Sequence, residues 1–152
     1  MDDACEYLWR LHSEEMTYVR HVETQRSTIA SVLIPISSAI LAAIAFQWKE
    51  TAAIVPALSA LLVLVGLVGV LFVGKLFELY REHTARARAY RKELSKRITA
   101  VNIETIRGEA DTRWKAEAPH LRRVPVHVLW LGPHVIPFLL GVLLLVVSTF
   151  RA

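Results

Sequence analysis

The residues best suited to chemistry in this sequence are two histidines in a long apolar stretch near its end. His127 and His134 are seven residues apart, which places them two turns apart on one face of a helix. An ionisable side chain in a membrane-like segment is a functional candidate by default. A neutral histidine can equally bond a backbone carbonyl that a proline has freed. Two interpretations stay open: a proton-sensitive gate, or packing against a neighbouring helix.

Hydroxyl side chains supply the other polar positions of the apolar stretches. They are Ser31, Ser37, Ser38 and Ser59. Small hydroxylated residues in a membrane helix favour close helix–helix approach and hydrogen bonds between helices. They are also the groups available to face the lumen of a channel. With the two histidines they form our candidate set for a pore or gate.

The sequence lacks the short motifs that mark common catalytic sites. No H-E-x-x-H, G-x-S-x-G, Walker loop or G-x-G-x-x-G occurs. Arg122 and His127 match the loose R-x4-H spacing of a ribonuclease signature, but Pro125 and a membrane boundary fall between them. The single cysteine, Cys5, excludes an internal disulfide and a C-x-x-C redox pair. We therefore expect no enzyme, no cofactor and no metal site.

Long apolar runs must position these residues. The chain has 152 residues, of which 54% are hydrophobic, and a mean hydropathy of +0.39. A bilayer core of about 30 Å needs about 20 apolar residues in a helix, and residues 30–46, 52–74 and 124–150 qualify. We predict an all-α integral membrane protein with three transmembrane helices. A signal peptide is not expected, because the start is acidic and no apolar run precedes Ile29.

The basic residues indicate the orientation of these spans. Thirteen of the 18 lysines and arginines lie in residues 75–123, and three lie in residues 1–29. The positive-inside rule places both segments in the cytoplasm of a bacterium and the C-terminus outside its inner membrane. The expected parts are a cytoplasmic N-terminal helix (1–29), a transmembrane hairpin (30–74), a cytoplasmic helical segment (75–123) and a third transmembrane helix (124–150).

The N-terminal segment has the pattern of an amphipathic helix over residues 3–29, with no glycine or proline. Its apolar side is expected to carry Tyr7, Leu11, Tyr18, Val22 and Ile29. His21, Glu23 and Arg26 come just before the first span. They fit a solvated helix face, or a switch at a subunit interface, where an unpaired buried charge would be costly.

The second span is expected to continue into the cytoplasm as one helix that Gly108 ends, with a short helix over residues 109–117 beyond it. Apolar or neutral residues recur along it at spacings of three and four, and we assign Tyr80, His83, Tyr90 and Leu94 to an interface or switch. So narrow a stripe needs a partner, either Leu11 and Tyr18 or copies of itself. Topology and anionic lipid heads already explain its basic face, so we do not expect nucleic acid as a partner.

The order of a helix, a short-looped hairpin of two spans and a long basic helix resembles the SLATT family. The resemblance covers about residues 20–98, and its best stretch is residues 75–94, KLFELYREHTARARAYRKEL. In that family an aromatic and basic helix of this kind also follows the second span. The third span, residues 124–150, departs from the two-span pattern of the family.

SLATT proteins are predicted effectors of bacterial conflict and anti-phage systems, associated with nucleotide-sensing partners. The resemblance implies a homo-oligomeric effector that forms a pore or disrupts membrane lipids when a cytoplasmic sensor protein detects infection. One chain has too few spans to enclose a channel, so a pore needs a symmetric ring. The alternative is a non-enzymatic anchor or accessory subunit that recruits a cytoplasmic partner through residues 75–107.

Overall fold

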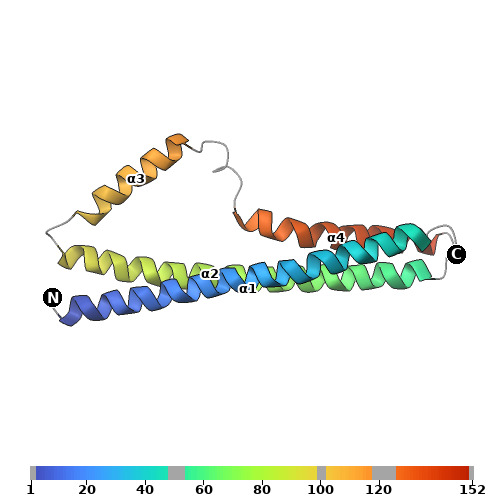
Figure 1. Cartoon of the computed structure of the whole chain (residues 1–152), viewed down its shortest axis with the longest axis horizontal. Helices are drawn as coiled ribbons and strands as arrows, with labels where there is room; N and C mark the ends of the chain where they lie inside the picture. The colour runs from blue at the N-terminus through green and yellow to red at the C-terminus, as the bar shows by residue number, and fades with distance from the viewer. Residues whose placement is uncertain (1–2, 48–53, 99–101, 118–125, 151–152) are drawn as a thin grey trace. The chain divides into compact units, whose positions relative to one another are not determined.

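The structure, a computed structural model, describes residues 3–47, 54–98, 102–117 and 126–150. Within these ranges all regular secondary structure is helical (Figure 1). The helices are α1 (Asp3–Gln47), α2 (Ile54–Arg97), α3 (Ile103–Glu117) and α4 (Val126–Thr149). The prediction of an all-α protein is therefore confirmed.

Three of the helices are long and apolar enough to cross a membrane. They are α1, α2 and the part of α4 that runs from Val128 to Thr149. The expected window 30–46 lies inside α1, and the described residues of the windows 52–74 and 124–150 lie in α2 and α4, except residue 150, which follows the end of α4. Residues 52–53 and 124–125 lie outside the described residues. Helix α3 has 15 residues and is mostly polar.

Helix α1 joins the expected N-terminal helix and the expected first span in one run of 45 residues. Neither glycine nor any other strong breaker separates the two parts. Pro35 lies inside the helix, where its ring removes one backbone donor, and α1 continues through it.

The prediction of one helix that runs to Gly108 is wrong. Helix α2 ends at Arg97, and Gly108 lies inside α3. The new helix starts where the Oδ1 atom of Asn102 accepts a hydrogen bond from the backbone N–H of Thr105 at 3.1 Å. Asparagine is among the best N-terminal capping residues because its side chain satisfies one of the first unpaired backbone donors. A cap at this point favours a new helix over continuation of the old one.

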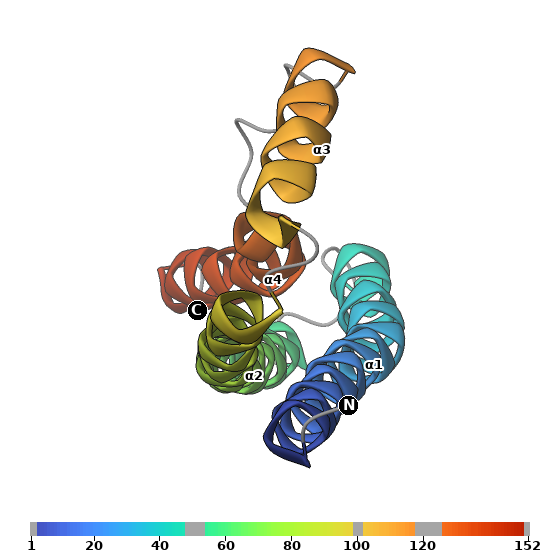
Figure 2. The same cartoon turned by 90° about the vertical axis from the view of Figure 1, so that its left-hand side faces the viewer.

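The contacts of the chain divide it into two compact units. We call Met1–Glu23 with Phe77–Pro125 the charged unit, and Thr24–Leu76 with Val126–Ala152 the apolar unit. Helices α1 and α2 contribute to both. In the charged unit the first turns of α1 lie beside the last turns of α2, which Figures 1 and 2 show in dark blue and yellow-green.

Buried positions recur along α2 at alternating spacings of four and three. They include Val55, Ser59, Leu62, Gly66, Gly69, Val73 and Leu76 in the apolar unit, and Ala87 and Leu94 in the charged unit. A seven-residue repeat of buried positions is the pattern of helices that coil around one another with a left-handed twist. Within the apolar unit, Ile40 and Ile44 of α1 pack with Val55 and Leu62 of α2 to form the core.

Candidate functional site

One exposed face of α1 in the apolar unit carries hydroxyl groups. Thr24, Thr28, Ser31 and Ser38 lie on this hydroxyl face, with Pro35 between the two serines and Ala42 and Ala45 beyond them. Their spacings alternate between four and three, so they form a row along one side of the helix. All seven positions are exposed.

Three of these hydroxyls donate their proton to their own helix. The Oγ1 atom of Thr28 donates to the carbonyl of Thr24 at 3.0 Å, and the Oγ atom of Ser31 donates to the carbonyl of Thr28 at 2.7 Å. The Oγ atom of Ser38 donates to the carbonyl of Ile34 at 2.9 Å. A hydroxyl that has given its proton still accepts hydrogen bonds through its lone pairs. The hydroxyl face can therefore bind water, cations or donors from another helix.

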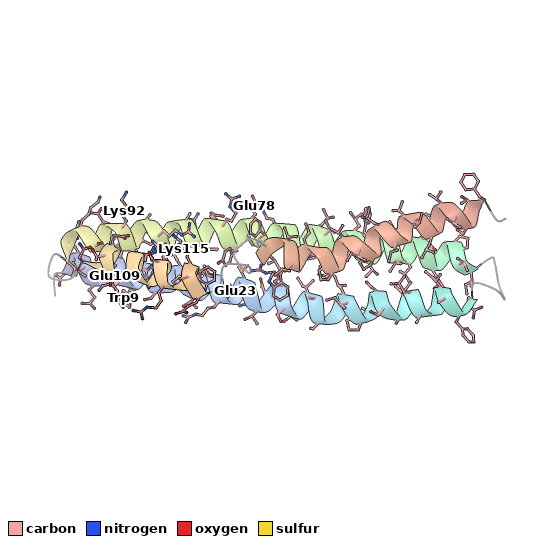
Figure 3. All side chains as sticks on the ribbon, turned by 90° about the horizontal axis from the view of Figure 1, so that it is seen from above. Trp9, Glu23, Glu78, Lys92, Glu109 and Lys115 are labelled. Atoms are coloured by element: carbon pink, nitrogen blue, oxygen red, sulfur yellow. The ribbon has the colours of Figure 1, made fainter. Side chains whose placement is uncertain are left out.

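The exposed faces of α2 and α4 in the apolar unit are of another kind. Leu61, Leu64 and Leu71 are exposed on α2, and α4 exposes Leu129 and Ile136 among other aliphatic side chains. Large aliphatic side chains suit contact with lipid tails, whereas small and hydroxylated ones suit contact with another helix. Figure 3 shows side chains extending outward along these helices.

The structure separates the six candidate pore or gate residues into two groups. Ser31 and Ser38 lie on the hydroxyl face, whereas Ser37, Ser59 and His134 are buried within the apolar unit. The side chain of the sixth, His127 of α4, lies outside what the structure describes. In a single chain, Ser31 and Ser38 are thus the candidates known to reach the surface.

His134 of α4 is buried against a glycine of α2. Its side chain is 2% exposed, and its ring lies directly over Gly69, where a Cβ atom would collide with it. Among the described residues, neither the Nε2 atom of His134 nor the buried Oγ atom of Ser59 has a hydrogen-bond partner. A buried polar group without a partner is unfavourable. The ring is therefore held in place by packing rather than by hydrogen bonding through Nε2.

Arg26 of α1 is buried in the same unit and lies over the ring of Trp130 of α4. The guanidinium carbon is 5.3 Å from the centre of that ring, a cation–π contact, and the side chain is only 4% exposed. Of the three residues expected to form a switch before the first span, Arg26 is buried, whereas His21 and Glu23 are exposed. Sequence reasoning missed Trp130, although a tryptophan near the start of a span was a visible signal.

In the charged unit, His83 of α2 meets two residues of α1. Its Nδ1 atom is 2.6 Å from a carboxylate oxygen of Glu15, and its ring stacks on Tyr18 with centroids 5.0 Å apart. One turn further, the Nδ1 atom of His12 is 3.0 Å from the carbonyl oxygen of Ala87. The narrow stripe on α2 thus has a partner in the N-terminal part of α1, one of the two options that the sequence left open.

The other residues assigned to that stripe fit this packing. Tyr80 and Tyr90 are half-buried, and Leu94 is buried. Glu15 and His12 were not expected on the packed side of α1 because both are polar. The expected apolar side was partly wrong, since Tyr7 and Tyr18 are more than half exposed.

Ion pairs line the outer side of α2 in the charged unit. Glu93 accepts a hydrogen bond from Lys96 at 2.9 Å and lies 3.7 Å from the Nε atom of Arg97. The hydrogen bond from Lys96, followed by the positive charge of that side chain, lowers the pKa of Glu93. The described residues contain no cluster of histidine, cysteine, aspartate or glutamate able to hold a metal ion.

Comparison of the chain with models of protein families, with curated proteins and with solved structures finds no match. Within the residues that the structure describes, the fold is all-α, and three of its helices are long and apolar enough to cross a membrane.

Proposed function

We propose that the chain is a membrane protein that assembles into a ring and forms a pore. The observation that carries this proposal is the hydroxyl face of α1, which is exposed in one chain while α2 and α4 expose mainly large aliphatic side chains. A ring of copies would turn this face inward and leave the aliphatic faces in contact with lipid tails.

The chemistry of the hydroxyl face favours an enclosed, partly wet surface over lipid. Hydroxyl oxygens that still accept hydrogen bonds gain nothing from lipid tails, which offer no donors. Ser31 and Ser38 are small, so the backbones of neighbouring copies can approach closely along them. With Arg26 covered by Trp130, the exposed face from position 28 to position 45 carries no charge. We infer a neutral lumen lined by oxygen acceptors, which suits small cations and water.

The proposed setting follows the charge pattern and the SLATT resemblance. Basic residues beside the spans support an N-terminus in the bacterial cytoplasm and a C-terminus outside the inner membrane. The resemblance supports a role as an effector of anti-phage defence that a cytoplasmic sensor protein activates. In that arrangement the sensor acts on the charged unit and biases the pore between closed and open states.

The mass of the full chain in detergent, measured by light scattering with the detergent mass subtracted, tests the proposal. We expect a homo-oligomer of four or more copies, and a monomer or dimer would overturn the autonomous pore. In lipid vesicles we expect Ser38→Leu to reduce the release of a trapped dye several-fold. Ala60→Leu is the matched control, because Ala60 is an exposed small residue of α2.

A second candidate function is an anchor that recruits a cytoplasmic partner. Its support is α3, on which every described side chain is exposed, including Ile106 and Trp114 at 58% and 54%. Exposed large apolar side chains eight residues apart lie on one helix face and suit a protein partner. This function predicts a monomer or small complex that leaves vesicles sealed.

A further inference from the structure

A basic pocket lies in the charged unit between the last turns of α2 and the first turns of α3. Its volume is about 490 Å³, within the range of about 300–1,000 Å³ that is common for small-molecule sites. We call it the basic pocket; its positively charged lining residues are Arg88, Arg91, Lys92, Lys96 and Arg107. Ser95 and Glu104 complete the lining, so only one carboxylate faces five cationic side chains.

Much of this positive charge lacks a counterion within the chain. Among the described residues Arg88, Arg91 and Lys92 form no ion pair, and the Nε atom of Arg91 is buried without a hydrogen-bond acceptor. Lys96 is bonded to Glu93 at 2.9 Å, and Arg107 lies 3.9 Å from Asp111. A buried donor without an acceptor is costly. An anion that enters the pocket would neutralise the guanidinium group of Arg91 and the positive charges beside it.

The geometry indicates an anion with more than one charged group. The four basic residues of α2 in the pocket share one face, and at 1.5 Å per residue the row from Arg88 to Lys96 is about 12 Å long. Arg107 adds a charge from the α3 side. Arginine presents a planar fork of donors that matches phosphate oxygens in pairs, and lysine adds point charges. We propose that the basic pocket binds a phosphorylated small molecule with two or more phosphate groups.

Both soluble molecules and lipid headgroups offer this chemistry, and distance favours the soluble source. Lys75 is the first charged residue of α2, and Arg88 follows it by 13 residues, or about 20 Å of helix. With the apolar part of α2 in a bilayer, as proposed above, the pocket lies well beyond the Debye length of about 8 Å within which a membrane surface attracts cations.

Isothermal titration calorimetry of the full chain in neutral detergent tests this proposal, with inorganic triphosphate as the probe and inorganic phosphate as its comparison. We expect triphosphate to bind at least tenfold more tightly than phosphate. Lys92→Gln should weaken triphosphate binding about tenfold. Lys115→Gln, which removes the same charge from an exposed position on α3 outside the pocket, should leave the affinity unchanged. Lys92 and Lys115 are labelled in Figure 3.

Glu104→Gln is a second variant that distinguishes a change in the pocket from misfolding, because misfolding would not increase the affinity for triphosphate. It removes the carboxylate that an anion must approach, so we expect it to strengthen triphosphate binding several-fold. Absence of triphosphate binding, or equal weakening by Lys92→Gln and Lys115→Gln, would overturn the proposal. A repeat in nanodiscs with and without phosphatidylinositol bisphosphate identifies the source. If the lipid leaves the affinity for triphosphate unchanged, the ligand is a soluble molecule. If the lipid competes with triphosphate, the ligand is a lipid headgroup with the same phosphate chemistry. None of these outcomes depends on the mass of the oligomer. The binding proposal and the pore proposal can therefore be tested independently.

Discussion

Replacement of Gly66 by alanine should disturb a close contact between α2 and α4. A Cβ atom on Gly66 would lie 2.6 Å from the backbone nitrogen of Phe138 and 2.7 Å from its Cα atom. Both atoms belong to the backbone of α4, so no side chain can rotate away to make room. Gly74 of the same helix is the matched control, because a Cβ atom there meets nothing within 4 Å.

The size of the effect follows from these distances. Ordinary contact begins at 3.4 Å and the nearest atom is at 2.6 Å, so α4 must retreat by about 0.8 Å at this point. A gap of about 0.5–1 Å already loses a quarter to a half of the dispersion energy of the contacts that it opens. Overpacking of this kind costs about 1–3 kcal/mol. Both variants gain similar helix preference from alanine, about 1 kcal/mol, and that gain cancels when they are compared.

We therefore expect Gly66→Ala to be less stable than Gly74→Ala by about 1–3 kcal/mol, which is about 5- to 150-fold in the unfolding equilibrium. Reversible unfolding in mixed micelles with a rising fraction of SDS, followed by circular dichroism, measures this difference. Equal midpoints for the two variants would refute the close contact between α2 and α4.

Two further predictions concern the charged unit. Glu15→Ala leaves the half-buried His83 without its acceptor and should cost about 1–3 kcal/mol; amide hydrogen exchange around His83 should quicken, and unchanged exchange would contradict the contact. Glu93 has a pKa lowered from 4.5 by the hydrogen bond of a neighbouring lysine, so its contribution to stability is present above its unfolded pKa and is lost as pH falls through the folded value. The protection factors of amides at the end of α2, which correct the exchange rates for the intrinsic effect of pH, should therefore fall in acid, and Glu93→Gln should remove that fall.

The long helices were predictable because apolar length alone specifies them. A run of about 20 apolar residues has few alternatives to a helix that can cross a bilayer. The hydrogen bond of Asn102 to Thr105 was harder to foresee. The side chain of one asparagine can start a new helix even where the surrounding residues favour a continuous one. The sequence pattern therefore predicted a helix that continued beyond the point where α2 ends.

Which side of each helix is buried was harder to predict. Ser37 and Ser38 are neighbours in sequence, yet one is buried and the other exposed, because adjacent residues of a helix point about 100° apart. Polar residues such as His12 and Glu15 lie on the packed side of α1, so the pattern of apolar residues alone does not identify that side. The contact of Arg26 with Trp130 joins residues more than a hundred positions apart, and no local pattern specifies it.

The thiol of Cys5 can report local opening of the first turns of α1. It is the single cysteine of the chain, and in the structure its thiol is free and buried. A water-soluble alkylating reagent can reach the sulfur only when the first turns of α1 separate from their packing. The labelling rate of the wild-type chain therefore measures how often this end opens, with no introduced probe. A ligand or partner that loosens the charged unit would give faster alkylation, and one that tightens it would give slower alkylation.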